Sequence, residues 1–111
     1  LKVPENVKVI EPIGYLDFLS LMNNSKLMLT DSGGVQEESC IIKKPCVTLR
    51  NATERPETLE VGSNMIAGTN PEKIVECVNI MLNKERNWQN PFGDGTTGKR
   101  IMDILEKELS L

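Results

Sequence analysis

Residues 26–38, with the sequence KLMLTDSGGVQEE, are the stretch that decides the fold. The apolar run at 26–30 ends in a polar, glycine-containing turn, which is typical of a buried strand. The turn leads at once into a helical pattern at 35–42. A strand joined to a helix by so short a turn predicts one βα unit of a parallel sheet.

The same alternation continues on both sides of this unit. We expect four strands, at residues 7–10, 26–30, 46–49 and 64–67. We expect helices at residues 16–23, 35–42, 56–61, 71–84 and 97–109. Because about 20 residues separate successive strands, each connection is long enough for a helical crossover. The order therefore predicts an α/β fold with a Rossmann-like parallel sheet and helices on both faces.

The length of 111 residues favours one domain over residues 1–111. The last helix, at about 97–109, is amphipathic, and it can pack outside this domain. We expect it to fold onto the domain, to pair with another copy or to be mobile. The chain does not begin with Met, so we expect a processed protein or a piece of a longer one.

Composition excludes several classes of function. The formal net charge of −3 argues against non-specific nucleic-acid binding, which needs a basic surface. No apolar run approaches the roughly 18 residues of a membrane span, so no membrane partner is expected. The chain has no His, which removes the commonest general acid or base. Any chemistry must rest on other residue types or on residues outside this chain.

The cysteines do not indicate a metal site. Cys40, Cys46 and Cys77 are widely spaced, include no C-x-x-C pair and have no His to complete a zinc site. We expect no metal and interpret them as small buried side chains in a reducing cytoplasm. A nucleophilic cysteine is the alternative.

Polar loops mark one edge of the expected sheet as a ligand site. In open parallel sheets, ligands bind beyond the carboxyl ends of the strands, here at residues 11–15, 31–34 and 50–57. The turn at 31–34 combines glycines with a helix N-terminus, which favours a phosphate or diphosphate. A tight turn capped by Ser or Asp is the alternative. Neither G-x-G-x-x-G nor a P-loop is present.

Two carboxylates follow this turn. Glu38 is four residues after Gly34, so it projects from the same side of the helix and can accept hydrogen bonds from a ribose diol. Its alternative is stabilisation of the helix dipole, and for Glu37 we prefer that simpler interpretation.

One basic and one aromatic residue complete the candidate site. Arg55, in the loop of the neighbouring strand, suits a bidentate phosphate contact. Its alternative is a surface ion pair with Glu54 or Glu57. Phe18 follows the first expected strand and can lie near a base, or it can simply pack its helix.

These blocks carry a family resemblance. Residues 29–38 (LTDSGGVQEE) and 53–57 (TERPE) closely resemble the non-hydrolysing UDP-N-acetylglucosamine 2-epimerases. Shorter matches are YLDF at 15–18, GTNPE at 68–72 and NPFGDG at 90–95. The resemblance extends in order along essentially the whole chain.

The resemblance implies the C-terminal, UDP-binding half of a B-type glycosyltransferase fold. Carried over by motif, Ser32, Gly33 and Gly34 would contact the phosphates of UDP, and Glu38 would bind the ribose. Arg55 would belong to the UDP site, and the segment around Phe18 would contact the uracil, largely through its backbone. Ile13 stands where the family often has a polar residue, so a side-chain contact to uracil is not expected there.

The resemblance also implies a reaction and its setting. The family inverts C2 of UDP-N-acetylglucosamine to give UDP-N-acetylmannosamine, by elimination and re-addition of UDP, without cofactor or metal. Its acid/base groups belong to the N-terminal half, so we expect no catalytic residue in this chain. We expect a cytoplasmic, homodimeric parent isomerase serving cell-surface polysaccharide biosynthesis. The alternatives are another UDP-sugar enzyme such as a glycosyltransferase, and a non-catalytic flavodoxin-like binding module.

Overall fold

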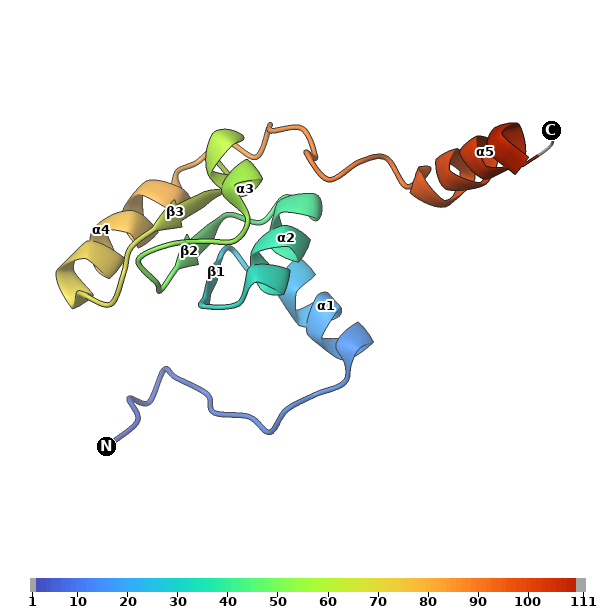
Figure 1. The fold of residues 1–111 in the computed structure, drawn as a ribbon. Helices are drawn as coiled ribbons and strands as arrows, with labels where there is room; N and C mark the ends of the chain where they lie inside the picture. Colours follow the sequence, from blue (N-terminus) through green and yellow to red (C-terminus); the bar gives the residue numbers. More distant parts are fainter. Residues whose placement is uncertain (1, 110–111) are drawn as a thin grey trace.

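A three-stranded parallel sheet forms the centre of the molecule (Figure 1). The structure is a computed structural model that describes residues 2–109. The strands are β1 (Met28–Thr30), β2 (Cys46–Thr48) and β3 (Asn64–Ile66), in the order β1-β2-β3. β2 is central, and Val47 pairs with Leu29 on one side and Met65 on the other. The predicted parallel pairing of these three strands is confirmed.

All five expected helices form within a few residues of their predicted bounds. They are α1 (Tyr15–Asn23), α2 (Gly33–Ile41), α3 (Pro56–Glu60), α4 (Pro71–Leu82) and α5 (Thr97–Leu109). The start of α4 shows why the sequence predicts it well. The Asn70 side chain accepts hydrogen bonds from the N–H groups of Glu72 and Lys73, and Pro71 occupies the first turn.

The side of the sheet that faces α4 is apolar. Val47 of β2 and Ala67, just after β3, pack against Cys77 and Met81 of α4, and all four are buried. Leu49 and Met65 pack against this cluster from the sheet. Val75 and Leu82 of α4 lie outside this cluster and are exposed.

The opposite side of the sheet is polar and faces α2 and α3. Thr48 Oγ1 donates to Asn64 Oδ1 at 2.7 Å, and Asn64 Nδ2 donates to Thr58 Oγ1 of α3 at 3.1 Å and to Gln36 Oε1 of α2 at 3.2 Å. All four residues are at most 3% exposed. Side chains alternate between the faces of a strand, so the sheet carries helices on both sides, as predicted.

The predicted strand at residues 7–10 is not formed. Residues 6–14 contain no strand, and the side chains of Val7, Val9 and Ile10 are exposed. A strand requires a hydrogen-bonded neighbour, and within the described chain β1 pairs with β2 alone. The expected four-stranded sheet is therefore wrong for this structure: the sheet has three strands.

The C-terminal segment leaves the sheet after α4. Trp88 is buried and donates its indole N–H to the Cys40 carbonyl oxygen at 2.9 Å, while the Lys43 ammonium lies over its ring. Beyond this anchor, α5 extends away from the sheet (Figure 1), and none of its residues is buried. No helix among residues 2–109 has the length and apolarity needed to cross a membrane.

Candidate functional site

The turn between β1 and α2 is built as a capped strand-to-helix junction. The N–H of Ser32 donates to Thr30 Oγ1 at 3.0 Å, and Ser32 Oγ accepts from the N–H of Val35 at 3.4 Å. Ser32 is thus the N-cap of α2. The first N–H groups of a helix have no partner within the helix, so the Gly33–Gly34 end of α2 is suited to an anion.

Gly33 lies close against side chains of the neighbouring loop. A Cβ atom placed there would lie 3.1 Å from Glu54 Oε2 and 3.6 Å from Arg55 Cζ. The absence of a side chain lets the loop at 50–57 approach the N-terminus of α2. The predicted loops at 31–34 and 50–57 are therefore brought together.

Glu38 faces the same turn. A Cβ atom at Gly34 would lie 3.8 Å from Ser32 Oγ and 3.9 Å from Glu38 Oε1, so these groups surround one point. Glu38 Oε2 is buried and has no hydrogen-bond partner within the described chain. A carboxylate oxygen in this state gains from a hydroxyl donor.

Tyr15 brings the start of α1 to the same carboxylate. Hydrogen bonding to Glu38, with desolvation and the negative charge of Glu38, raises the pKa of the Tyr15 hydroxyl above its usual value. Tyr15 belongs to the expected loop at 11–15, and its hydroxyl lies near the Glu38 carboxylate. Because residues 7–10 form no strand, this loop does not leave the edge of the sheet as expected.

Arg55 pairs with Glu37, not with Glu54 or Glu57. Arg55 Nε donates to Glu37 Oε2 at 2.9 Å, and both side chains are only about one-third exposed. Glu54 instead pairs with Arg50 at 3.0 Å, in a more exposed ion pair. The interpretation of Glu37 as a carboxylate that only complements the helix dipole is therefore incomplete, because its side chain forms an ion pair with Arg55.

Sequence reasoning missed Gln36 and Thr53. The hydroxyl of Thr53 donates to Gln36 Oε1 and accepts from the N–H of Arg55, the latter at 3.0 Å. Gln36 belongs to the buried polar layer on this side of the sheet, which also contains Thr48, Thr58 and Asn64. This buried polar layer thus supports the loop that carries Arg55. The sequence spacing could have indicated that Gln36 is buried. It lies four residues before Cys40, and therefore on the same side of α2 as that buried residue.

Phe18 lies on α1 beside a mainly apolar hollow. The hollow has a volume of about 370 Å³, and its lining residues are Ile10, Glu11, Pro12, Ile13, Phe18 and Leu21. Phe18 is half-buried and lies one turn along α1 from Tyr15. A flat, partly apolar ring such as a pyrimidine suits this lining.

Neither metal chemistry nor thiol chemistry has support in the described residues. Residues 2–109 contain no group of three His, Cys, Asp or Glu side chains that could hold a metal ion. Cys40, Cys46 and Cys77 are free and buried, as predicted. Burial raises the pKa of the Cys46 thiol to about 11, which disfavours the reactive thiolate.

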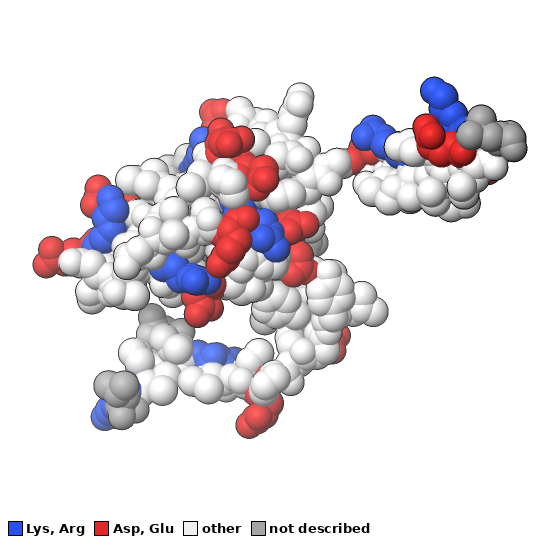
Figure 2. Space-filling view, in the orientation of Figure 1, with Lys and Arg blue, Asp and Glu red and all other residues white. Residues whose placement is uncertain are grey.

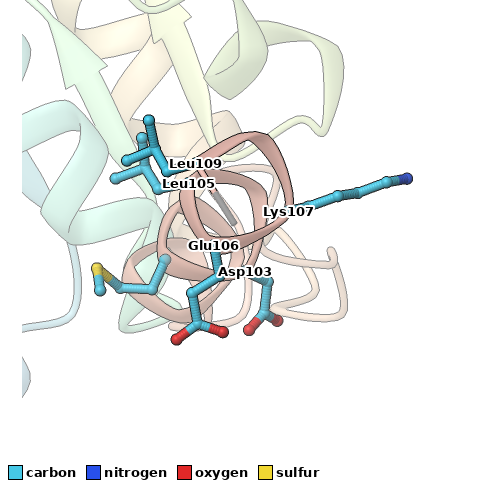
Figure 3. A pocket seen from close by; sticks show the side chains of 6 residues that line it. Asp103, Leu105, Glu106, Lys107 and Leu109 are labelled. Atoms are coloured by element: carbon cyan, nitrogen blue, oxygen red, sulfur yellow. The ribbon is translucent and has the colours of Figure 1, made fainter. Parts of the chain in front are cut away.

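Two other features of the surface lie apart from this turn. Figure 2 shows acidic and basic side chains interspersed on the face in view, without a continuous basic patch there. A hollow of about 750 Å³ is lined by residues of α5 alone (Figure 3), where Leu105 and Leu109 lie on a different side of the helix from Asp103 and Glu106. With one helix as its only wall, this hollow is an open surface of α5.

A family model described as UDP-N-acetylglucosamine 2-epimerase matches residues 1–106. The chain belongs to this epimerase family. A UDP-N-acetylglucosamine 2-epimerase of Methanocaldococcus jannaschii is 62% identical over 105 residues, which are 95% of this chain and 29% of that protein. The enzyme of Escherichia coli K12 is 43% identical over 108 residues, 92% of this chain and 29% of its own length.

Solved structures of epimerases share the fold. The crystal structure of the Methanocaldococcus jannaschii epimerase in complex with UDP-GlcNAc and UDP matches with a TM-score of 0.85 and 61% identity, over 93% of this chain and 28% of that one. The Neisseria meningitidis epimerase bound to UDP-GlcNAc matches with a TM-score of 0.79 and 38% identity, over 93% of this chain and 30% of that one. The chain thus spans less than one-third of the length of these epimerases. Membership of the epimerase family argues against the two alternatives, another UDP-sugar enzyme such as a glycosyltransferase and a non-catalytic flavodoxin-like binding module.

Proposed function

We propose that this chain is the C-terminal, UDP-binding half of a UDP-N-acetylglucosamine 2-epimerase. The parent enzyme would interconvert UDP-N-acetylglucosamine and UDP-N-acetylmannosamine by elimination and re-addition of UDP. The observation that carries the proposal is the convergence of Ser32, Gly33, Gly34, Glu38 and Arg55 on the N-terminal turn of α2. The 61% identity to an epimerase solved with UDP-GlcNAc and UDP supports the choice of ligand.

In this proposal the diphosphate binds at the start of α2. Ser32, Gly33 and Gly34 supply backbone N–H groups and the positive end of the helix dipole. Arg55 lies beside Gly33 and adds a guanidinium, whose planar donors match phosphate oxygens. These preorganised donors would stabilise UDP as it leaves the sugar.

The nucleoside extends from the diphosphate toward α1. Glu38 would accept hydrogen bonds from the ribose hydroxyls through Oε1, the oxygen that lies toward Gly34. The uracil would lie in the hollow beside Phe18, and Ile13 would offer it an apolar contact. Specific recognition of the uracil edge then falls to backbone groups.

The proton transfers at C2 belong to another part of the parent protein. The chain contains no His, and of the carboxylates near the turn Glu38 is assigned to the ribose, Glu37 pairs with Arg55 and Glu54 pairs with Arg50. A second, N-terminal domain would close over the sugar, exclude water and supply the acid and base. With contacts on one side only, this chain would bind UDP with a dissociation constant on the order of 0.1–1 mM.

A residue-level chemical-shift map with UDP tests the binding site. The expected result is saturable shifts at residues 31–38, at Arg55 and around Phe18. Shifts confined to α4 or α5 would place UDP elsewhere, and the absence of saturable shifts would contradict the proposal. Adenosine diphosphate is the matched control, because it shares the diphosphate and ribose but not the base.

Deuterium incorporation at sugar C2 tests whether the catalytic base lies outside this chain. In heavy water with UDP-N-acetylglucosamine, this chain alone should give no more exchange than buffer. Exchange above the buffer control that a substitution in this chain abolishes would place the catalytic base here.

The setting of the parent enzyme follows from the same reasoning. We propose a cytoplasmic homodimer whose product serves cell-surface polysaccharide biosynthesis. Three free, buried cysteines support a reducing compartment.

A further inference from the structure

A carboxylate that the sequence left without a specific role holds the guanidinium beside the anion site. Glu37 Oε2 accepts from Arg55 Nε at 2.9 Å. The two residues are 18 positions apart in the chain, on α2 and on the loop after β2. The ion pair therefore ties the Arg55 loop to the same helix whose first turn forms the proposed phosphate site.

The contacts of Arg55 leave donors on the side that the diphosphate needs. Nε is occupied by Glu37, and Nη1 donates to the carbonyl oxygen of Glu54 at 3.2 Å. A Cβ atom at Gly33 would lie 3.7 Å from Nη1, so this nitrogen lies next to the start of α2. A guanidinium has five N–H donors, and these two bonds leave three of them for a ligand.

The backbone of Arg55 is held independently of this ion pair. Its N–H donates to Thr53 Oγ1, and Thr53 bonds to the buried Gln36. Loss of the Glu37 carboxylate would therefore leave the loop in place, with the Arg55 side chain held only by its bond to the Glu54 carbonyl oxygen. A less restrained arginine side chain loses more rotamer entropy when it binds, which weakens the contact it makes.

We propose that Glu37 is a positioning residue that orients Arg55 toward the diphosphate of UDP. This inference rests on the proposed function of the site. The alternative role of Glu37 is competition, in which its negative charge competes with the diphosphate for Arg55. The two differ in sign, because loss of a positioning residue weakens UDP binding and loss of a competitor strengthens it.

Three substitutions separate these cases, with UDP and uridine as the probes and chemical-shift titration of the full 111-residue chain as the measurement. Glu37→Ala should raise the dissociation constant for UDP about 3- to 10-fold, less than the loss of a direct charge-assisted hydrogen bond, because Glu37 acts through Arg55 and does not itself contact UDP. Glu37→Gln keeps an acceptor for Nε without the charge, and it should bind UDP within about 2-fold of the unsubstituted chain, as expected if one neutral hydrogen bond suffices. Glu76→Ala removes an exposed carboxylate from α4 and is the matched control, with no expected change.

Uridine and a double substitution show whether Glu37 acts through Arg55. Uridine has no diphosphate, so its binding should be unchanged by Glu37→Ala, whereas a folding defect would weaken both ligands. In an Arg55→Ala background, Glu37→Ala should have no further effect on UDP. Tighter UDP binding by Glu37→Ala, equal loss of uridine binding, or an undiminished effect without Arg55 would each overturn the role of Glu37. If the unsubstituted chain binds UDP and Glu37→Ala binds it equally well, only this role is wrong; if the unsubstituted chain binds neither ligand, the proposed function fails as well.

Discussion

Arg55 and Glu38 are the two side chains whose charges the proposed site depends on. Arg55 is one-third exposed and already oriented by Glu37, while Glu38 has one oxygen buried without a partner. Such partly shielded groups form stronger contacts than fully exposed ones, because water screens them less. Single substitutions should therefore have measurable effects on UDP.

Arg55→Ala and Glu38→Ala should each weaken UDP binding by about 1–3 kcal/mol, the range for hydrogen bonds to charged groups. Calorimetry or shift titration measures the change. The two variants should differ with ligand. Inorganic pyrophosphate should be sensitive to Arg55→Ala and insensitive to Glu38→Ala, because it has no ribose. The opposite ranking would contradict the assignment of Glu38 to the ribose.

Cys46 should be inert toward thiol reagents in the folded chain. Burial raises its pKa to about 11, so the folded state favours the neutral thiol and only a small fraction is thiolate at pH 8. The thiolate is the reactive form. Ellman's reagent should therefore react slowly with the native chain and rapidly with all three cysteines in denaturant. A fast-reacting Cys46 under native conditions would show that the α2 side of the sheet is open to solvent.

At the scale of elements, the buried polar layer sets the position of α2 and α3 on the sheet. Asn64 joins Thr48 of β2, Thr58 of α3 and Gln36 of α2 through three hydrogen bonds. Apolar packing tolerates small shifts of a helix, but a hydrogen bond requires its donor and acceptor within a narrow geometry. This layer therefore fixes the helix that carries the Gly33–Gly34 turn.

Asn64→Ala should lower the free energy of unfolding by about 1–3 kcal/mol, because it leaves buried groups of its neighbours without partners. Urea denaturation followed by circular dichroism measures this loss. Asn79→Ala, at an exposed position of α4, is the matched control and should change stability little. Equal effects of the two substitutions would mean that water replaces Asn64 in the layer.

At the scale of the whole molecule, the chain is extended. Its radius of gyration is 17.5 Å, and its principal dimensions are 66, 30 and 24 Å. A compact chain of this length has a radius of gyration of about 13 Å. Figure 1 shows the cause: residues 2–14 and α5 both project from the sheet region. Their exposed apolar side chains, among them Val9, Ile10, Ile104 and Leu109, need partners beyond the sheet that is present.

Amides of α5 should exchange with solvent much faster than those of α4. α5 has 13 residues and no buried side chain, and an isolated helix of that length is marginal in water. Hydrogen exchange of a dilute sample measures this, with α4 as the internal reference because it buries Cys77 and Met81. Protection of α5 equal to that of α4 would mean that it folds onto the domain, and protection that rises with protein concentration would mean that copies pair through it.

The sequence by itself determined the local units. The spacing of apolar residues placed the five helices and three of the strands, and Asn70 and Ser32 are the caps that their positions before helices predict. The turn at 31–34 identified the carboxyl edge of β1, and its motif matched the family that the comparison confirmed. These features depend on residues close together in the chain, so a linear pattern contains them.

Only the tertiary structure decided which separate segments meet. Residues 7–10 have the apolar pattern of a strand, yet they form none because no neighbour lies beside them. Glu54, Glu57 and Glu37 were all possible ion-pair partners of Arg55. The packing of the Arg55 loop on α2 selected Glu37. Gln36 became part of a buried polar layer because β2 and β3 present Thr48 and Asn64 to α2. A ladder, an ion pair and a buried hydrogen bond each need two partners, and the second partner is supplied by the fold.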